Sequence, residues 1–469
     1  MRRLLIVPAL GMLLAGCAST PRDQGFTPIV EEVAARTGNE VAWNQGSAAD
    51  QQVAERIRTL LAADLTPDSA VAIALLNSPR LHATYQELGI SQADLVQAGM
   101  LANPTLSGAV KFFPDGTKVE LGLAENLVSV FALPARQRLA AARVEEAKQI
   151  VLGAILATIG ETRRAAYHVL AAQQRLELMT TVHEALAASF DLARRIHDAG
   201  NSSDLQFASE QAAFEETKLT LQATESAVAD AREDLSVALG LWGPAAATWK
   251  LPGRLPDLPA DPGFGDGTGL EKTAIAHSTA LAAQREAIRA LGERYGVERL
   301  DAWFGSVELG VAAERESDGS RGIGPEAGIA IPLFDQGQGR QAAASAELER
   351  AARTYIATAV DIRAAVRRAR SATQSGFDRA RFVRDVLLPV KLKIQQEALL
   401  HYNGMLTGPF QVLEAKRETV LTGRRLIDEL ETYWRARAVL DQLLSGSLAT
   451  MSLTPQADSL PATSGASHD

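Results

Sequence analysis

The sequence has little of several residue types on which large exported proteins usually depend. Its 469 residues include one cysteine, Cys17, so no disulfide can form within the chain. Aromatic residues make up only 5% of the chain, and the abundant alanine in their place favours long packed helices over a large globular core. The net charge of −9, with no basic patch that carries interleaved aromatics, argues against nucleic acid as a partner.

Long apolar runs are also missing. After the first residues, no run approaches the roughly 20 apolar residues that a membrane-spanning helix needs. Residues 1–16 combine a basic start with a short apolar run and small residues, which predicts a secretory signal that is removed. The tetrad Leu14-Ala15-Gly16-Cys17 resembles the bacterial lipobox, and Ala18 resembles the outer-membrane sorting pattern. We expect Cys17 to be lipidated; the alternative is an ordinary signal peptide with an incidental thiol.

Motifs of catalysis and of metal binding are missing as well. The seven histidines lack metal-ligand spacing, and no second cysteine is present to join them. The segments Gly322-Ile323-Gly324 and Gly337-Gln338-Gly339 are too short to cradle a phosphate and are typical of turns. Because the acidic residues follow helix-surface spacing, no general acid and base stand out. We therefore expect no enzyme, no metal site and no cofactor.

The sequence does contain a duplication. Residues 136–200 match residues 340–404 at a constant offset of 204, which lays Gly200 over Gly404, and residues 77–81 match 277–281 at an offset of 200. Self-similarity over so long a period indicates a duplicated structural unit. The expected divisions are an N-terminal periplasmic segment (17–66), repeat 1 (67–243), a Pro/Gly-rich linker (244–269), repeat 2 (270–447) and a disordered tail (448–469).

The sequence of each repeat predicts two long antiparallel helices. The stretch from Ala135 to about Ala199 lacks proline and is dense in strong helix formers, which predicts a rod of about 100 Å. Residues 200–204 then predict a helix stop and a new N-cap, followed by a return helix to about Leu241. The second copy repeats this pattern from 338 to about Leu444, and Pro389 is expected to bend its long helix.

A β-hairpin is predicted before each long helix, at about 105–131 and 304–333. Apolar and polar residues alternate along these segments, on both sides of an Asp-Gly turn in the first copy. A lone hairpin is not stable in water, so these strands are either edge hairpins packed on the helices or parts of a membrane barrel. Four strands cannot close a barrel with a lumen, whereas three chains would supply twelve.

This order of elements resembles the TolC-type outer-membrane efflux channel family, in its lipoprotein branch. The matching motifs are Ile331-Pro332-Leu333-Phe334-Asp335-Gln336-Gly337, Tyr402-Asn403-Gly404 and Val412-Leu413-Glu414-Ala415. The resemblance implies a mainly α fold with β strands: a homotrimer that forms a 12-stranded β-barrel in outer-membrane lipid and an α-helical tunnel in the periplasm. It also implies an exit duct that passively conducts substrates from an inner-membrane efflux pump through a periplasmic adaptor, or membrane fusion protein.

The resemblance further implies roles for residues at the helical turns. The expected adaptor-contact tips are Gly200, Asn201, Ser202, Asp204, Gly404, Met405, Leu406 and Thr407. The expected entrance gate comprises Tyr402, Gln411, Glu414 and Glu210. Because Gln411 is uncharged and the second turn is one residue longer than the commonest version, an acidic ring would rest on Glu414, with Glu210 from the first copy. Alternatively, Glu414 is a solvated residue of a helix face.

Two other functional classes stay open at this stage. An outer-membrane-anchored helical scaffold lipoprotein without a pore would have hairpins that merely pack on its rods. An anchored hydrolase would need a cleft and a nucleophile, and neither is visible in the sequence. The substrate of a passive duct is not readable from its sequence, although residues 402–406 resemble branches associated with heavy-metal export.

Overall fold

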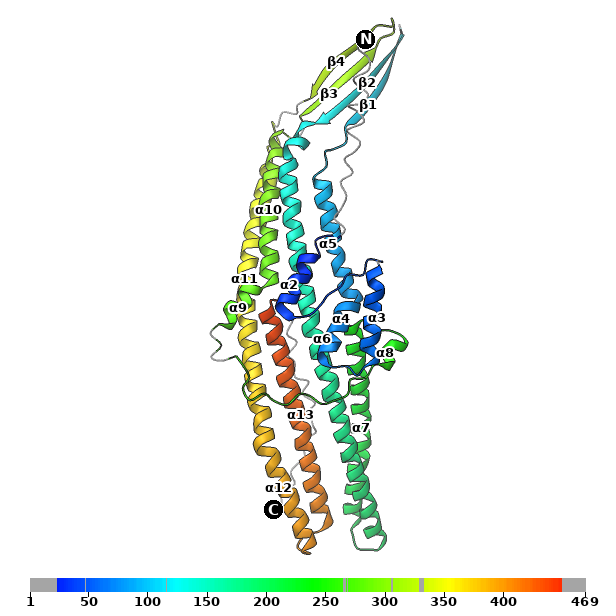
Figure 1. The fold of residues 1–469 in the computed structure, drawn as a ribbon, viewed down its shortest axis with the longest axis vertical. Coiled ribbons are helices and arrows are strands. Elements are labelled where there is room, and N and C mark those ends of the chain that lie inside the picture. The colour runs from blue at the N-terminus through cyan, green and yellow to red at the C-terminus, as the bar shows by residue number, and fades with distance from the viewer. Residues whose placement is uncertain are drawn as a thin grey trace.

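The protein is an elongated rod in which a small sheet stands at one end of a bundle of long helices (Figure 1). The computed structural model describes residues 23–448, apart from 47, 115, 265, 266, 268, 305, 306 and 329–332. The expected signal sequence, Cys17, the tail beyond 448 and the motif residues Ile331 and Pro332 lie outside the described residues. None of the helices in the described part of the chain is both long enough and apolar enough to cross a membrane.

The same series of elements occurs twice, which confirms the predicted duplication. The first series comprises α4 (Pro67–Asn77), α5 (Pro79–Ala98), β1 (Thr105–Phe113), β2 (Gly116–Asn126), α6 (Leu127–Asp198) and α7 (Asp204–Leu239). The second comprises α9 (Leu270–His277), α10 (Thr279–Phe304), β3 (Glu308–Arg315), β4 (Arg321–Gly328), α11 (Gln338–Phe382), α12 (Leu388–Asn403) and α13 (Pro409–Ser445). Outside the series lie α2 (Thr27–Thr37), α3 (Ala48–Ala62) and α8 (Pro244–Thr248).

Equivalent arginines of the two copies make equivalent ion pairs. Arg163 of α6 bonds Asp68 in the first turn of α4 at 3.0 Å, and Arg367 of α11 bonds Glu271 in the first turn of α9 at 3.1 Å. Each pair holds the start of a short helix against the middle of a long one. The duplication therefore extends from sequence to individual contacts.

The return helix of each copy ends at a glycine that touches the short helices. Gly240 and Gly446 have φ of 68° and 113°, the left-handed region that glycine reaches without strain. A Cβ on Gly240 would lie 2.6 Å from the Cδ of Pro79, and a Cβ on Gly446 would lie 2.1 Å from the carbonyl oxygen of His277. Only glycine fits these two junctions, which close each repeat on itself.

The long helix of the first copy starts earlier than the sequence predicts. α6 has 72 residues, begins at Leu127 and contains Pro134, whereas the hairpin was expected to run to about 131 and the helix to start at Ala135. Pro134 lies inside α6, beyond its first turn, so it removes one backbone hydrogen bond and crowds the carbonyl of the preceding turn, at a cost of about 3 kcal/mol. The helix continues through it, and the neighbouring Ala132 and Ala135 are buried.

The second long helix is interrupted near Pro389, where a bend is predicted. A π-helical turn, Val383–Leu387, follows α11, and α12 starts at Leu388. Pro389 therefore lies in the first turn of α12, where its missing N–H is tolerated. The wide turn is how the helix accommodates the proline.

The four strands form one antiparallel sheet in the order β1-β2-β3-β4. The central pairing joins the two copies, with Asn126 opposite Glu308 and Val119 opposite Arg315. All nine residues of β1 are exposed, so this edge strand does not pack on the helices. β1 and β4 are the two outer strands of the sheet, and each has an unpaired edge within the protomer.

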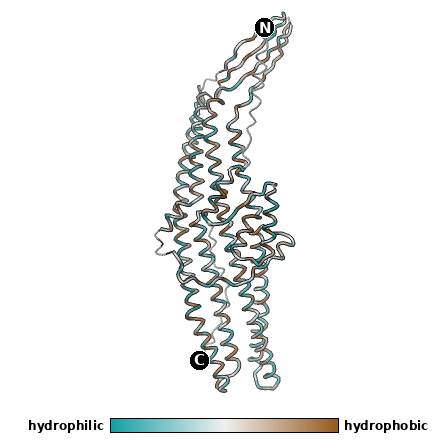
Figure 2. The backbone as a smooth tube through the Cα atoms, viewed as in Figure 1, coloured by the Kyte–Doolittle hydropathy of each residue, from teal (hydrophilic) through white to brown (hydrophobic). Residues whose placement is uncertain are grey.

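The two faces of the sheet differ in polarity, as the period-two pattern predicts. The register places Leu106 beside Leu123, and Leu123 beside Val311, on one face. The opposite face carries ion pairs that cross strands, from Lys111 to Glu120 at 2.8 Å and from Lys118 to Glu314 at 2.6 Å. Hydrophobic and hydrophilic colours alternate along these strands in Figure 2. One face suits lipid and the other suits water.

The N-terminal segment and the linker both cross the waist of the rod. Phe26 and Trp43 pack against each other and against the buried Tyr85 of α5 in edge-on or tilted contacts, with ring centroids 4.9–5.9 Å apart. Arg36 of α2 donates to the carbonyl oxygens of His277 and Ser445, at 2.9 and 3.0 Å. This segment therefore ties repeat 1 to both ends of repeat 2.

The linker lies along the return helices. The indole of Trp249 is buried and donates to the Oγ of Ser236 at 3.0 Å. Trp434 and Arg437 of α13 donate to the carbonyl oxygens of Pro256 and Pro262, at 2.7 and 2.5 Å. The linker thus straps α7 to α13 at the waist.

Candidate functional site

The two helical turns at the end opposite the sheet form the first tip (residues 199–203) and the second tip (residues 404–408) (Figure 1). At the first tip, Gly200 is left-handed with φ of 73°. Its N–H donates to the carbonyl of His197 at 2.8 Å, and the N–H of Asn201 donates to that of Ile196 at 3.0 Å. This pair of bonds is the Schellman motif that ends many helices. Ser203 then caps α7.

The second tip has the same hydrogen bonds, but one residue later than the sequence match predicts. The N–H of Met405 donates to the carbonyl of Tyr402, and that of Leu406 to His401, both at 2.9 Å. Met405 takes the left-handed conformation with φ of 59°, whereas Gly404 has φ of −82°. The structural equivalent of Gly200 is therefore Met405 rather than Gly404. The extra residue of this turn lengthens α12.

The predicted adaptor-contact residues all lie at or beside these tips, and the two tips differ in chemistry. The first tip is polar, and Asp204 next to it pairs with His197 at 2.9 Å. The second tip is apolar, with Met405 94% and Leu406 74% exposed. The hydroxyls of Ser202 and Thr407 are buried within their own turns and make no hydrogen bond.

Two of the four predicted gate residues meet in one cleft. Glu210 of α7 and Glu414 of α13 both line a cavity of about 220 Å³ that separates α6 and α7 from α13. Glu210 accepts a hydrogen bond from the buried Ser189 at 2.8 Å, and Glu414 pairs with Arg417 at 3.0 Å. The remaining lining residues are Thr181, Val182, Ala185, Leu186, Ser209, Ala213, Phe410, Leu413, Lys416 and Val420.

The other two gate residues lie outside this cleft. Tyr402 is 43% exposed near the end of α12, and Gln411 is exposed in the first turn of α13. Glu414 is a half-exposed helix residue whose charge is offset within the protomer by Arg417. Glu210 has no cationic partner among the described residues.

A ladder of stacked rings, which the sequence reasoning missed, stiffens the hairpin of α6 and α7. His183 stacks on Phe214, Phe214 on Phe190, Phe190 on Phe207, and Phe207 on His197, with centroids 4.7–5.8 Å apart. The three α6 residues are spaced by seven, as are the two α7 residues. That heptad spacing is the signal that could have identified the ladder.

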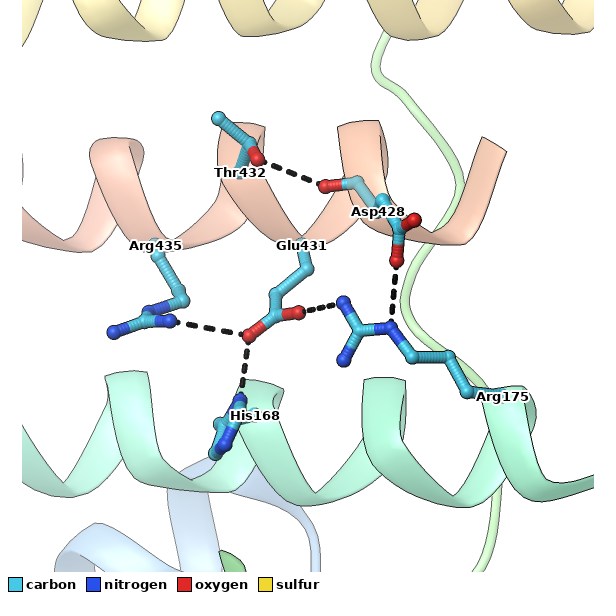
Figure 3. A network of polar contacts seen from close by, with 6 residues as sticks. All are labelled: His168, Arg175, Asp428, Glu431, Thr432 and Arg435. Carbon is cyan, nitrogen blue, oxygen red and sulfur yellow. Dashed lines mark hydrogen bonds and ion pairs between the residues drawn. The ribbon is translucent and has the colours of Figure 1, made fainter. Parts of the chain in front are cut away.

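A charged network joins α6 to α13 nearer the waist (Figure 3). Glu431 is buried and lies 2.7 Å from the Nδ1 of His168, in contact with Arg175 and 3.2 Å from Arg435. Arg175 also bonds Asp428 at 2.6 Å. Burial would raise the pKa of Glu431, but the hydrogen bond with His168 and the charge of Arg175 prevail and lower it to about 2. The carboxylate is therefore charged at all physiological pH values.

Polar links between the two hairpins stop at this network. Among the described residues, no hydrogen bond or ion pair joins 181–220 of α6 and α7 to 388–420 of α12 and α13. The cleft occupies this unlinked interval. A movement of one hairpin relative to the other near the tips would therefore break no polar contact between these described residues.

No site for a metal emerges from the part of the chain that the structure describes. Its His, Cys, Asp and Glu side chains form no group of three arranged around a common point. The described residues thus form two helical hairpins, a cleft between them that two carboxylates and two cationic side chains line, and an amphipathic sheet at the far end.

Known proteins share this geometry. The model of the family described as outer membrane efflux protein matches residues 70–241. The matched residues lie in the first repeat, which resembles the outer membrane efflux protein family. Relatives of this chain include the cobalt-zinc-cadmium resistance protein CzcC of Cupriavidus metallidurans, 23% identical over 82% of this chain and 90% of that protein.

Solved structures share the fold of this chain. A membrane protein from Pseudomonas aeruginosa has a TM-score of 0.68 at 19% identity, covering 81% of this chain and 93% of that one. The Campylobacter jejuni CmeC outer membrane channel also has a TM-score of 0.68, at 14% identity, covering 81% and 86%. CusC, whose crystal structures concern folding and transmembrane channel formation, has a TM-score of 0.64 at 18% identity, covering 82% of this chain and 93% of that one.

Proposed function

We propose that three copies of this chain assemble into the exit duct of a tripartite efflux system. Twelve strands would form one closed barrel, and the hairpins would form a tunnel through the periplasm. The duct passively conducts substrates that an inner-membrane pump delivers through a periplasmic adaptor docked at the tips. It carries out no catalysis, and lipidated Cys17 adds a second anchor in the outer membrane.

The observation that carries this proposal is the sheet, which has one apolar face, one charged face and two open edges. Unpaired backbone groups on an edge are too costly in hydrocarbon, so the edges of β1 and β4 must pair with other copies. Closing the ring turns the apolar face to lipid and the face of Lys118 and Glu120 to a water-filled lumen.

Conductance separates the duct from a scaffold lipoprotein without a pore. Detergent-purified protein added to planar lipid bilayers is expected to give discrete ion-conducting steps and to run as a heat-modifiable trimer on gels. A protein that leaves bilayers silent and stays monomeric after the lipid anchor is removed would favour the scaffold.

We propose the cleft of Glu210 and Glu414 as part of the entrance gate. Three copies would place three Glu210 carboxylates near the tunnel entrance, where they favour cations, whereas Glu414 is paired with Arg417 and Lys416 also lines the cleft. The double variant Glu210→Gln/Glu414→Gln is expected to shift the reversal potential in a salt gradient toward weaker cation preference. Glu397→Gln, an exposed carboxylate of α12 outside the cleft, is the matched control and should leave the potential unchanged.

Divalent metal cations are the substrate class that we propose. The support is the cobalt-zinc-cadmium resistance in the name of the relative CzcC, together with the Glu210 carboxylate in the cleft. A host that lacks its own channel, supplied with this chain and its pump and adaptor, should regain tolerance to zinc, cobalt and cadmium. Regained tolerance to organic antibiotics alone would assign the duct to drug export instead.

A further inference from the structure

The apolar face of the sheet ends in a pair of arginines. Arg315 is the last residue of β3 and Arg321 is the first residue of β4, and the register places them directly opposite each other. Arg315 follows Val311 by four residues along β3, so both lie on the apolar face, because residues two apart along a strand share a face. Both arginines are exposed, at the end of the sheet farther from the helices (Figure 1).

The charged face of the sheet has a matching pair of cations that is neutralised. Lys111 and Lys118 are also directly opposite each other, and they bond carboxylates of β2 and β3 at 2.8 and 2.6 Å. Among the described residues, by contrast, no hydrogen bond or ion pair holds the guanidinium group of Arg315 or of Arg321. Like charges directly opposite each other in a sheet are destabilising, so the arginine pair lacks an anion that the lysine pair has.

The neighbouring elements do not supply this anion. In the turn that joins β3 to β4, Glu316 lies 4.0 Å from the Nζ of Lys118 on the charged face. Asp318 accepts a hydrogen bond from the N–H of Ser320 at 2.8 Å. β1, the strand that barrel closure would bring beside β4, contains no acidic residue. The anion that fits between the two arginines is therefore to be sought outside the protein.

We propose that Arg315 and Arg321 bind a phosphate group of the glycolipid in the outer leaflet of the outer membrane. The inference rests on the proposed function, in which the apolar face meets lipid and the helices lie in the periplasm, so that this end of the sheet reaches the outer leaflet. Two guanidinium groups suit a phosphate, which they bind through paired, charge-assisted hydrogen bonds.

The surface beside the pair suits the rest of such a lipid. Ile323 and Val311, which are 80% and 53% exposed, lie on the same face between the arginines and the helices. Acyl chains that hang from a headgroup held by the arginines would run along these side chains. The order of charge and apolar surface thus matches that of a phosphorylated lipid.

The test counts lipid molecules bound to delipidated, detergent-purified trimer by native mass spectrometry. The probe is lipid A, the phosphorylated glycolipid of the outer leaflet, and the control probe is lipid A from which the phosphates have been removed. Arg315→Gln/Arg321→Gln removes the proposed site. Lys111→Gln/Lys118→Gln is the matched control, because it removes the same charge from an opposed pair on the other face. A general attraction of anionic lipid to this end of the sheet would weaken equally in both variants.

The parent is expected to bind one lipid A per copy, at least tenfold more tightly than the dephosphorylated lipid. The Kd of Arg315→Gln/Arg321→Gln should rise at least tenfold, whereas that of the lysine variant stays within threefold of the parent. Trimer formation by both variants shows that they are folded. An equal loss in the two variants, or equal binding of the two lipids by the parent, overturns the lipid site but leaves the duct in place. A parent that forms no trimer and conducts no ions overturns the duct and the site together.

Discussion

At the scale of single residues, the buried carboxylate of Glu431 is the strongest electrostatic feature of the helical bundle. It lies on α13 and makes hydrogen bonds with His168 and Arg175 of α6, so it joins the two copies. A carboxylate buried in this way is stabilising only while its cationic partners remain in place. It also marks where polar links between the hairpins end and the cleft begins.

The charged network around Glu431 makes the free energy of unfolding depend on pH in the acid range. Because folding lowers the pKa of Glu431 from 4.5 to about 2, its contribution is complete above pH 4.5 and is lost as the pH falls through 2. Glu431→Gln is therefore expected to lower the free energy of unfolding by about 2–3 kcal/mol at pH 7 and to differ little from the parent near pH 2. Denaturant unfolding followed by circular dichroism at the two pH values measures both.

Asp428 provides the control for this variant. It bonds the same Arg175, but its side chain is 44% exposed, and solvent screens such a pair. Asp428→Asn is expected to cost less than about 1 kcal/mol at pH 7. Equal costs for Asp428→Asn and Glu431→Gln would contradict the assignment of the network to the buried carboxylate.

At the scale of elements, the junction between α13 and α9 depends on a glycine that the fold encloses. A Cβ at Gly446 would overlap the carbonyl of His277, whereas a Cβ at Gly200 would meet nothing within 4 Å, although both residues are left-handed. Gly200→Ala should therefore cost only the conformational penalty of about 1 kcal/mol. Gly446→Ala adds overpacking and should cost about 2–4 kcal/mol. Thermal unfolding of the two variants distinguishes these effects, and equal shifts would show that the close approach is unimportant.

The polarity of the sheet faces gives a second prediction for this scale. Leu121 lies on the apolar face, and Ala312 lies on the opposite face. In the register of β2 and β3, Leu121 pairs with Ala313 and Gly122 pairs with Ala312, so the two residues are at nearly the same position along the strands. Arginine on a lipid face costs about 2–4 kcal/mol near the bilayer centre, whereas a lumen tolerates it. Leu121→Arg should deplete trimer from the outer-membrane fraction, and Ala312→Arg should not. The reverse result would mean that the faces are assigned the wrong way round.

The sequence was sufficient for features with a local signal and insufficient for those set by packing. Alternation along residues 105–123 predicted the two faces of the sheet, and Gly200 with Ser203 predicted the first turn. No local pattern in the sequence indicates that β2 pairs with β3, because that pairing depends on how the two copies pack together. The shift from Gly404 to Met405 was missed because glycine is the usual marker of a helix end, and here the chain does not use it.

At the scale of the whole molecule, the waist of the rod carries contacts that join distant parts of the chain, whereas its two ends have a cleft and open strand edges. The waist carries the aromatic cluster of Phe26, the strap of the linker and the network of Glu431. Toward the tips, the hairpins separate around the cleft, and toward the membrane the sheet has open edges. A trimer built on the waist can therefore close its barrel while its entrance rearranges.

Barrel closure makes a prediction about which strands meet between copies. An even ring of antiparallel strands requires β1 of one copy to lie beside β4 of the next, because these are the two free edges. Val110→Cys on β1 is combined in turn with cysteine at Ile323, Pro325 or Ala327, which all lie on the same face of the sheet as Val110. One pair is expected to form disulfides that link three chains into a closed ring, visible as a covalent trimer on non-reducing gels.

Only a cyclic arrangement produces that trimer. In a ring, each copy offers one cysteine to each neighbour, so oxidation ends at three chains whatever the protein concentration. A scaffold whose sheets meet face to face or in open chains would instead give dimers or an unlimited ladder. Val110→Cys alone is the control, because its three cysteines lie on separate strands around the barrel and should not cross-link. A covalent trimer from the pair and none from the single variant would fix the order of the twelve strands.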